Sequence, residues 1–351
     1  MTKDKERKNY MKGKGIGVAG NMIVDILYPV RGLPAPGELT SILDGISRSS
    51  GGALCNVIAD LASLDPELPL SALGRVGTDG EGDFILERMG KYPNINLSQV
   101  KREGITSFTA VMSDEITRQR TFFHYRGANA CFCEDDINWD TLDVSLLHIG
   151  YILLLDTLDE ADPECGTRMA RLLRTAQSRG IKTSLDVVSE AGDRFKRIVP
   201  PALKYADYCI INELEAAQVT GVPLRDGSGV LIGAGGTDCG ANMREALKRM
   251  RSFGVSEWAV IHCPEGGFGL DREGRYEAVP SLALPDGYIK GTVGAGDAFC
   301  AGALYGAYTG AGLREGMELG IASAACSLSR PGATEGMRSA AEAMDLYRKL
   351  I

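Results

Sequence analysis

The sequence has few of the residues on which metal centres, disulfide scaffolds and membrane anchors depend. Among 351 residues there are 3 histidines and 2 tryptophans, and the 9 cysteines form neither a CxxC pair nor another spacing typical of a metal site. The longest strongly apolar segment, Ile149–Leu155, is far shorter than the ~20 residues that a membrane-spanning helix needs. The odd cysteine count and the apolar surroundings of most cysteines predict reduced, buried thiols in a cytoplasmic protein.

An excess of basic residues is also missing. Acids outnumber bases by 46 to 38, which gives a formal net charge of −8. A general nucleic-acid-binding protein normally carries a basic surface, so this charge argues against that class. Residues 1–14 are mostly charged and contain no apolar stretch of the kind that a signal peptide requires. We therefore expect a charged tail at 1–14 and one folded domain at 15–351, with no membrane and no nucleic acid as partner.

Apolar strands and amphipathic helices alternate along the C-terminal part of the chain. The predicted elements, beginning with a strand, lie at 146–153, 164–179, 182–187, 194–206, 208–211, 213–220, 242–253 and 258–262, of which 213–220 and 242–253 are consecutive helices. This alternation is typical of βαβ units, so we expect an α/β fold with a parallel-dominated central sheet and helices on both faces. In open sheets of this kind, ligands bind at the carboxyl ends of the strands.

The N-terminal part predicts further strands and two helices. Strands are expected at 16–26, 38–50, 70–76, 105–112 and 119–125, and helices at 51–65 and 82–90. The strands 105–112 and 119–125 are expected to form a β-hairpin with its turn at 113–118. The glycine-rich stretch 227–240 is interpreted as an insertion with no assigned role.

A GxGxxG string at Gly15, Gly17 and Gly20 would by itself suggest a dinucleotide site. In such sites the string follows a strand and opens a helix. Here the charged N-terminus precedes it, and the string lies within the first predicted strand. We therefore assign no dinucleotide site to these glycines.

The segment Gly291–Gly302, with the sequence GTVGAGDAFCAG, carries the sharpest functional signal. Gly294, Ala295 and Gly296 stand at the start of a predicted helix, where uncovered N–H groups and the helix dipole form an anion hole for a phosphate. Asp297 in the first helical turn can reach a substrate hydroxyl, and a carboxylate base beside an anion hole suits phosphoryl transfer to an alcohol. The residues alone leave open a plainer reading, in which Asp297 is a helix N-terminal acid and the glycines only pack.

This segment resembles the DTxGAGD signature of the ribokinase-like (PfkB) carbohydrate kinases, and further motifs of that family follow in order over nearly the whole chain. They are Gly20-Asn21 with Asp25, the GGxxxN sugar loop at 51–56, the GxVGxDxxG segment at 74–82 and the NxxE motif at 212–215. The sugar loop reads GGALCN, which looks closest to the fructokinase-type members. The resemblance implies a ribokinase-like fold with a small β-sheet lid at approximately 27–50 and 105–126.

The resemblance also implies an ATP-dependent sugar kinase that transfers the γ-phosphoryl group to a hydroxymethyl group of a neutral sugar. Asp297 would be the base and Gly294, Ala295 and Gly296 the anion hole. The sugar would contact Asp25, Gly51, Gly52, Asn56 and Asn129. The nucleotide would contact Asn212, Glu215, Gly267, Thr292, Gly294, Gly296 and Gly332. The metal would be Mg²⁺, bound by Glu215 through water, and relatives of this kind often form homodimers through the lid.

Two positions depart from the family pattern. Gly291 replaces the acid that opens the signature and that helps to fix a monovalent cation in relatives, so we expect weak activation by potassium. Pro264 stands where the nucleotide loop usually has glycine, which leaves the nucleotide preference open. His124, His148 and His262 share no ligand spacing and are expected to be structural.

Several alternatives follow from the same residues. Asp186, at the end of a predicted strand, is expected near the phosphates. A phosphosugar kinase would need a cation near the substrate, which Ala53 and Leu54 of the sugar loop do not supply but lid arginines could: Arg118, Arg120 and Arg126. A nucleoside kinase on the same fold is the main alternative function. The intact base and small-residue hole argue against a catalytically silent sugar-binding homologue.

Overall fold

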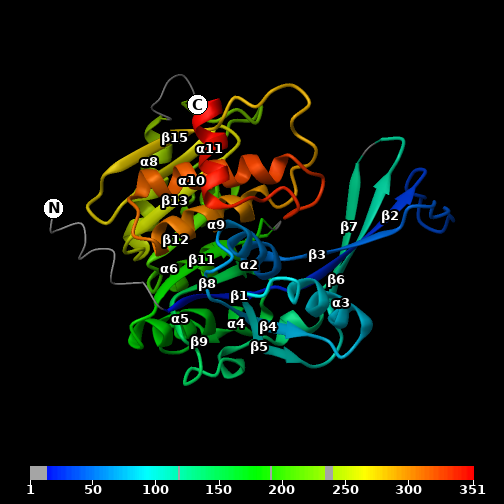
Figure 1. Cartoon of the computed structure of the whole chain (residues 1–351), viewed down its shortest axis with the longest axis horizontal. Coiled ribbons are helices and arrows are strands. Elements are labelled where there is room, and N and C mark those ends of the chain that lie inside the picture. The colour runs from blue at the N-terminus through cyan, green and yellow to red at the C-terminus, as the bar shows by residue number, and fades with distance from the viewer. Residues whose placement is uncertain (1–13, 118, 190–191, 234–239) are drawn as a thin grey trace.

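The structure is a computed structural model that describes residues 14–117, 119–189, 192–233 and 240–351 (Figure 1). Arg118 of the expected lid therefore lies outside the described residues, and the expected tail at 1–14 and insertion at 227–240 lie partly outside them. No helix within the described ranges is long and apolar enough to cross a membrane.

Nine strands form the central sheet. In chain order they are β1 Gly15–Gly20, β4 Leu70–Val76, β5 Ile95–Arg102, β8 Val144–Ile152, β11 Lys182–Val187, β12 Tyr208–Asn212, β13 Trp258–Cys263, β14 Gly266–Leu270 and β15 Tyr276–Pro280. Their order in space is β15-β14-β13-β12-β11-β8-β1-β4-β5. Every neighbouring pair from β13 to β5 is parallel, and β14 and β15 add two antiparallel strands at one edge. The expected parallel-dominated sheet is confirmed.

Helices cover both faces of this sheet (Figure 1). One group comprises α4 Asp156–Asp159, α5 Arg168–Ser178, α6 Phe195–Leu203, α7 Glu213–Thr220 and α8 Gly240–Phe253. The other comprises α2 Ala53–Leu64, α3 Gly80–Met89, α9 Ala295–Tyr308, α10 Leu313–Leu328 and α11 Ala340–Leu350. Successive strand residues belong to opposite cores, as Ile210 and Ile211 of β12 do, because side chains alternate across a sheet. With both faces covered, the central strands are apolar along most of their length, and this apolar pattern is what predicts them from the sequence.

A second sheet projects from the body beyond the end of β1 (Figure 1). Its strands, in spatial order, are β3 Ser47–Gly51, β2 Ile23–Val30, β6 Ser107–Asp114 and β7 Arg120–Tyr125. β2 and β6 are parallel, and the two outer pairs are antiparallel. The expected hairpin of 105–112 and 119–125 is present as β6 and β7. The sheet begins at Ile23 rather than at residue 27. That residues 27–50 and 105–126 form a lid stays a prediction.

Small elements complete the described chain. A two-stranded sheet, β9 Ala161–Asp162 and β10 Gly166–Thr167, precedes α5, so that helix begins at Arg168 and not at the expected residue 164. The 3₁₀ helices η1 Gly127–Cys131 and η2 Glu134–Asp136 lead from the second sheet to β8.

The GxGxxG string lies inside β1, and the next element along the chain is β2 rather than a helix. Gly15, Gly17 and Gly20 are buried, and a Cβ at Gly15 or Gly20 would collide with the backbone carbonyl of Pro69 or Gly150. These glycines therefore let β1 lie close to its neighbours, and the placement agrees with the decision to assign no dinucleotide site.

The expected single strand 16–26 is instead two strands, because the chain turns at Asn21 and Met22. The side-chain amide of Asn129 fixes this turn: Oδ1 accepts a hydrogen bond from the backbone N of Met22 and Nδ2 donates one to its carbonyl, each 3.1 Å long. The turn moves Asp25 out of the central sheet and into β2 of the second sheet. A contact across 107 residues of sequence thus sets the direction of a strand.

Candidate active site

The helix α9 begins with an uncapped turn. Its N-cap is Gly294, whose φ of 80° disfavours any residue with a side chain, and a Cβ there would lie 2.6 Å from that of Ala333. No side chain caps the helix, and no acceptor in the described part of the chain takes the N–H groups of Gly296 and Asp297. Two free donors thus lie at the positive end of the helix dipole, whereas the N–H of Ala295 is 3.5 Å from the Thr292 carbonyl oxygen. The anion hole expected at Gly294, Ala295 and Gly296 stays a prediction, with the free donors displaced by one residue toward Asp297.

The carboxylate of Asp297 lies in this first turn and is only 5% exposed. Its Oδ1 accepts a hydrogen bond from the hydroxyl of Tyr151, and its Oδ2 accepts one from Nδ2 of Asn56, each 2.8 Å long. Burial raises the pKa of Asp297 to about 6, while the two hydrogen bonds hold it down. A carboxyl group with that pKa is mostly ionised at neutral pH and accepts a proton more readily than an ordinary aspartate, which suits a general base.

Asn21, at the turn after β1, joins the elements that hold the base. Its backbone carbonyl accepts a hydrogen bond from the N–H of Leu54 in α2, and its Oδ1 accepts one from the N–H of Tyr151 at the end of β8, both 3.1 Å long. Within the described residues, Nδ2 of Asn21 and Oδ1 of Asn56 are buried and have no hydrogen-bond partner. A spare donor and a spare acceptor around the base suit the hydroxyl groups of a substrate.

Asp25 lies against the glycine loop that precedes α2. A Cβ at Gly51 would collide with the Asp25 carboxylate, and Gly52, the N-cap of α2, has a φ of 86° and would place a Cβ 2.5 Å from the Asn21 carbonyl. Both glycines are therefore required for this close approach. Burial raises the pKa of Asp25, a sign that its charge is not compensated by a cation.

The pKa of the Cys55 thiol indicates that Asp25 and Asp297 lie in one region, because both charges act on it. That pKa is raised to about 12, first by burial and then by the negative charges of Asp25 and Asp297. The structure thus brings together four of the five predicted sugar contacts beside the predicted base: Asp25, Gly51, Gly52 and Asn56.

Asn129, the fifth predicted sugar contact, is not available to a substrate. Both polar atoms of its side-chain amide are engaged by the backbone of Met22 at the turn into β2. The residue is a structural one, and we withdraw it from the substrate contacts.

Two further buried carboxylates lie at the same edge of the central sheet. Asp186 is near the end of β11, and its Oδ1 accepts a 2.7 Å hydrogen bond from the N–H of Val187. Glu215 belongs to a capping box of α7: Asn212 accepts hydrogen bonds from the N–H groups of Leu214 and Glu215, and Oε2 of Glu215 accepts one from the N–H of Asn212. The NxxE motif therefore starts a helix and places a carboxylate at the same time.

The charges of these acids are uncompensated. Burial raises the pKa of Asp186 well above its usual range, and the charges of Glu215 and Asp297 add to this effect. Burial also raises the pKa of Glu215 to about 7. Carboxylates are the ligands that Mg²⁺ prefers, so Asp186 and Glu215 fit a magnesium ion. No group of three or more His, Cys, Asp and Glu in the described ranges is arranged to hold a metal, so the ion would depend on phosphate oxygens as well.

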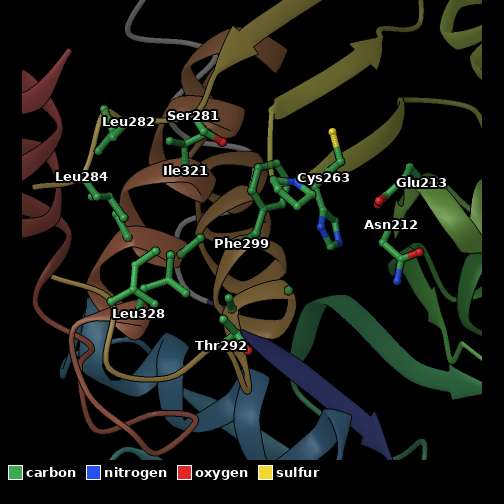
Figure 2. Close-up of a pocket in the computed structure, with 17 residues that line it drawn as sticks. Asn212, Glu213, Cys263, Ser281, Leu282, Leu284, Thr292, Phe299, Ile321 and Leu328 are labelled. Atoms are coloured by element: carbon green, nitrogen blue, oxygen red, sulfur yellow. The ribbon is translucent and has the colours of Figure 1, made fainter. Parts of the chain in front are cut away.

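A cavity of about 550 Å³ opens beside the anion hole (Figure 2). Ala295 and Gly296 of α9 form part of its wall. In Figure 2 the apolar side chains Leu282, Leu284 and Leu328 lie on one side of the cavity, and Asn212 and Glu213 lie on the other. The cavity thus has an apolar end for a flat ring and a polar end near the anion hole.

Comparison with known proteins decides the family. The model of the pfkB family of carbohydrate kinases matches residues 14–340. The chain belongs to this family. It is 24% identical over 322 residues to the ribokinase of Arabidopsis thaliana, with 91% of this chain and 77% of the relative covered. It is also 24% identical over 313 residues to the 5-dehydro-2-deoxygluconokinase of Bacillus velezensis, with 86% of each covered.

The fold of this pfkB kinase agrees with the family. The structure of Arabidopsis thaliana ribokinase complexed with ribose and ATP matches with a TM-score of 0.75 and 20% identity, and covers 95% of this chain and 99% of that one. The expected ribokinase-like fold is confirmed, and the protein is a phosphotransferase that acts on sugars.

The predicted nucleotide contacts of the pfkB kinase are only partly assembled. Asn212, Thr292 and Gly296 line the cavity, and Gly294 caps the helix at its wall. The other three are not among the residues that line this cavity. Glu215 lines a neighbouring hollow of about 630 Å³, a Cβ at Gly267 would lie 3.0 Å from the ring of Phe299, and a Cβ at Gly332 would lie 2.7 Å from the carboxyl carbon of Glu335.

Sequence reasoning missed Tyr151 and the apolar end of the cavity. Tyr151 lies at the carboxyl end of a predicted strand, where ligands bind in open sheets, and that position was the one signal for it. The apolar end comes from a segment without regular structure and from α10, for which the sequence offers no motif.

Proposed function

We propose that this kinase transfers the γ-phosphoryl group of ATP to a hydroxymethyl group of a neutral sugar. The observation that carries the proposal is the position of Asp297, a buried carboxylate oriented by Asn56 and Tyr151 at the free N-terminus of α9. That terminus opens on the 550 Å³ cavity. A base, an anion hole and a cavity for a nucleotide are the parts that this reaction needs.

In the proposed mechanism the sugar lies between the second sheet and α2. Asp25 and the spare polar atoms of Asn21 and Asn56 orient its hydroxyl groups. Asp297 accepts the hydroxyl proton as the sugar oxygen attacks the γ-phosphorus, the bond from that phosphorus to the bridging oxygen breaks, and ADP leaves. The N–H groups of Gly296 and Asp297 stabilise the developing charge. Bound Mg²⁺, held by Asp186 and Glu215, would neutralise charge on the nucleotide phosphates.

The apolar end of the cavity supports ATP as the phosphoryl donor. A purine base can pack against Leu282, Leu284 and Leu328 while its phosphates extend toward Gly296. The solved structure of the Arabidopsis ribokinase is a complex with ribose and ATP, which supports the same choice here.

A neutral sugar is favoured over a sugar phosphate because the sugar loop supplies no cation and two nearby arginines are held in ion pairs. Ala53 and Leu54 are buried, Arg48 forms an ion pair with Glu81 at 3.2 Å, and Arg126 pairs with Asp156 at 3.0 Å. Of the other lid arginines, Arg118 lies outside the described residues and Arg120 is exposed on β7 without an ion pair in the described chain, so Arg120 is the cation that a sugar phosphate would need. A phosphate dianion would lose its hydration without compensation, at a cost on the order of several kcal/mol. This supports a ketohexose or a pentose of the fructokinase or ribokinase type.

A homodimer through the second sheet is also part of the proposal. β7 is an edge strand, and it carries three exposed aromatic side chains: Phe122, Phe123 and Tyr125. Exposed edges and apolar patches of this kind commonly pair with another chain. Sedimentation of the parent and of Phe122→Ser would test it, because a dimer through this face should dissociate in the variant.

The decisive experiment is a phosphorylation assay with ATP, Mg²⁺ and a substrate panel of fructose, ribose, fructose 6-phosphate and adenosine, with products identified by mass. We expect a phosphorylated neutral sugar as the main product. Asp297→Asn is the matched control, in which turnover should fall roughly 10²–10⁴-fold. Preference for fructose 6-phosphate or adenosine would replace the proposal by one of the alternatives, and turnover of Asp297→Asn within threefold of the parent would refute the base.

A further inference from the structure

The imidazole of His262 is fixed beside the anion hole. His262 is in β13 and lines the cavity. Its ring lies on that of Phe299, with 4.9 Å between the centroids and a tilt of 31°. On the side of α9, a Cβ at Gly296 would be 3.2 Å from Cε1 and 3.7 Å from Nε2 of His262. The ring thus packs against Phe299 and Gly296 of α9, next to the first turn of that helix, where the N–H groups of Gly296 and Asp297 are free.

The ring nitrogens of His262 have no hydrogen-bond partner in the part of the chain that the structure describes. The other two histidines differ: His124 is bonded to Thr109 at 3.1 Å, and His148 to Ser184 at 3.0 Å. Burial lowers the pKa of His262 to about 4, so the ring is neutral at neutral pH and carries one N–H donor. A donor held in a cavity without a protein acceptor is available to a ligand.

A ligand at the polar end of the cavity can use this donor, because His262 lines that cavity. Gly296 brings the ring into contact with the first turn of α9, and a larger residue there would displace it. The groups that a helix N-terminus attracts are anionic. A neutral donor beside them adds a hydrogen bond to an anion without adding a second charge that must be desolvated.

We propose that His262 is a nucleotide-contacting residue whose ring N–H donates a hydrogen bond to a phosphate oxygen beyond the α-phosphate, beside the backbone N–H groups of Gly296 and Asp297. The inference rests on the proposed function, since it places the phosphates of the donor at α9. It replaces the expectation that His262 is structural, whereas buried His148 fits that expectation.

Calorimetric titration of two variants tests the contact without any need for turnover. His262→Leu removes the donor and keeps much of the volume, and His262→Gln keeps a neutral N–H donor. The ligands are AMP, ADP and a non-hydrolysable ATP analogue, each with Mg²⁺. We expect His262→Leu to weaken the ATP analogue roughly tenfold or more and to leave AMP within about twofold, with His262→Gln recovering most of the loss.

The pattern across ligands separates a phosphate contact from a packing role. A loss for both ADP and the analogue would assign the β-phosphate, and a loss for the analogue alone would assign the γ-phosphate. Equal losses for all three ligands, or no loss, would overturn the inference. His124→Leu, on β7 of the second sheet, is the matched control and should bind all three as the parent does. Nucleotide binding without sugar phosphorylation would refute the proposed transfer and still decide the role of His262; a parent that binds no nucleotide would refute both.

Discussion

The hydroxyl of Tyr151 donates a 2.8 Å hydrogen bond to Oδ1 of Asp297, across 146 residues of sequence. Together with Asn56 on Oδ2, it holds both oxygens of the carboxylate. The base is therefore oriented from α2, from the end of β8 and from its own helix. The backbone N–H of Tyr151 is in turn bonded to Asn21, so a change at the turn after β1 would alter the position of Tyr151 and with it the orientation of Asp297.

Tyr151→Phe should shift the pH dependence of the reaction. It removes one of the two hydrogen bonds that lower the pKa of Asp297, so that pKa should rise above its present value of about 6. The acid limb of the kcat/KM profile should move to higher pH, with a larger loss of rate at pH about 6 than at pH about 8.5. Tyr308→Phe is the control, since Tyr308 is bonded to the carbonyl of Lys14 at the other end of α9. A profile that coincides with the parent's would contradict this role.

Asp25→Ala should weaken the sugar selectively. A charged acceptor of a hydroxyl hydrogen bond contributes roughly 1.5–3 kcal/mol, which corresponds to more than tenfold in affinity. Nucleotide affinity should be nearly unchanged, because Asp25 lies in β2 and not at the cavity. Titration of sugar and nucleotide measures both, with the exposed Asp44→Ala as control. A matching loss for the nucleotide would argue against the placement of the sugar.

Potassium should stimulate this kinase weakly. A Cβ at Gly291 would lie 2.7 Å from the carbonyl oxygen of Pro331 and 3.1 Å from that of Arg330, so the loop fills the space where an acidic side chain would begin. We expect less than about threefold stimulation relative to a bulky organic cation at equal ionic strength. Stimulation of tenfold or more would mean that backbone carbonyls complete a cation site without the acid.

Asp60→Asn should stabilise the protein at neutral pH. Asp60 in α2 is fully buried, neither carboxylate oxygen has a partner among the described residues, and burial and then the charge of Asp297 raise its pKa well above the ordinary 3.8. At pH values above 3.8 the unfolded chain releases the Asp60 proton, whereas the folded protein keeps it. The free energy of unfolding therefore falls as the pH rises. The variant should melt higher than the parent at pH about 7.5 and near the parent at pH about 3.5. The same difference at both pH values would show a packing effect instead.

Local pattern predicted much of the framework. β4, β11 and α7 have the expected bounds, because apolar runs and capping residues act within a few neighbours along the chain. The helix start at Gly294 was predictable for the same reason, since Gly294 to Asp297 are consecutive and a helix start needs no distant partner. The two edge strands β5 and β15, and β14 next to β15, went unpredicted: β5 is largely polar, and β14 is rich in glycine.

The chemical setting of these motifs was decided by tertiary structure alone. Asn129 matched an expectation about the sugar but turned out to hold the turn at Met22, and the break between β1 and β2 depends on that contact. Tyr151 reaches Asp297 only because β8 lies beside β1 in the central sheet, and His262 meets Gly296 only because β13 passes close to α9. Hydrogen-bond partners and burial arise from packing between segments that are far apart in sequence. The sequence could therefore predict the residue types of the site but not their protonation or orientation.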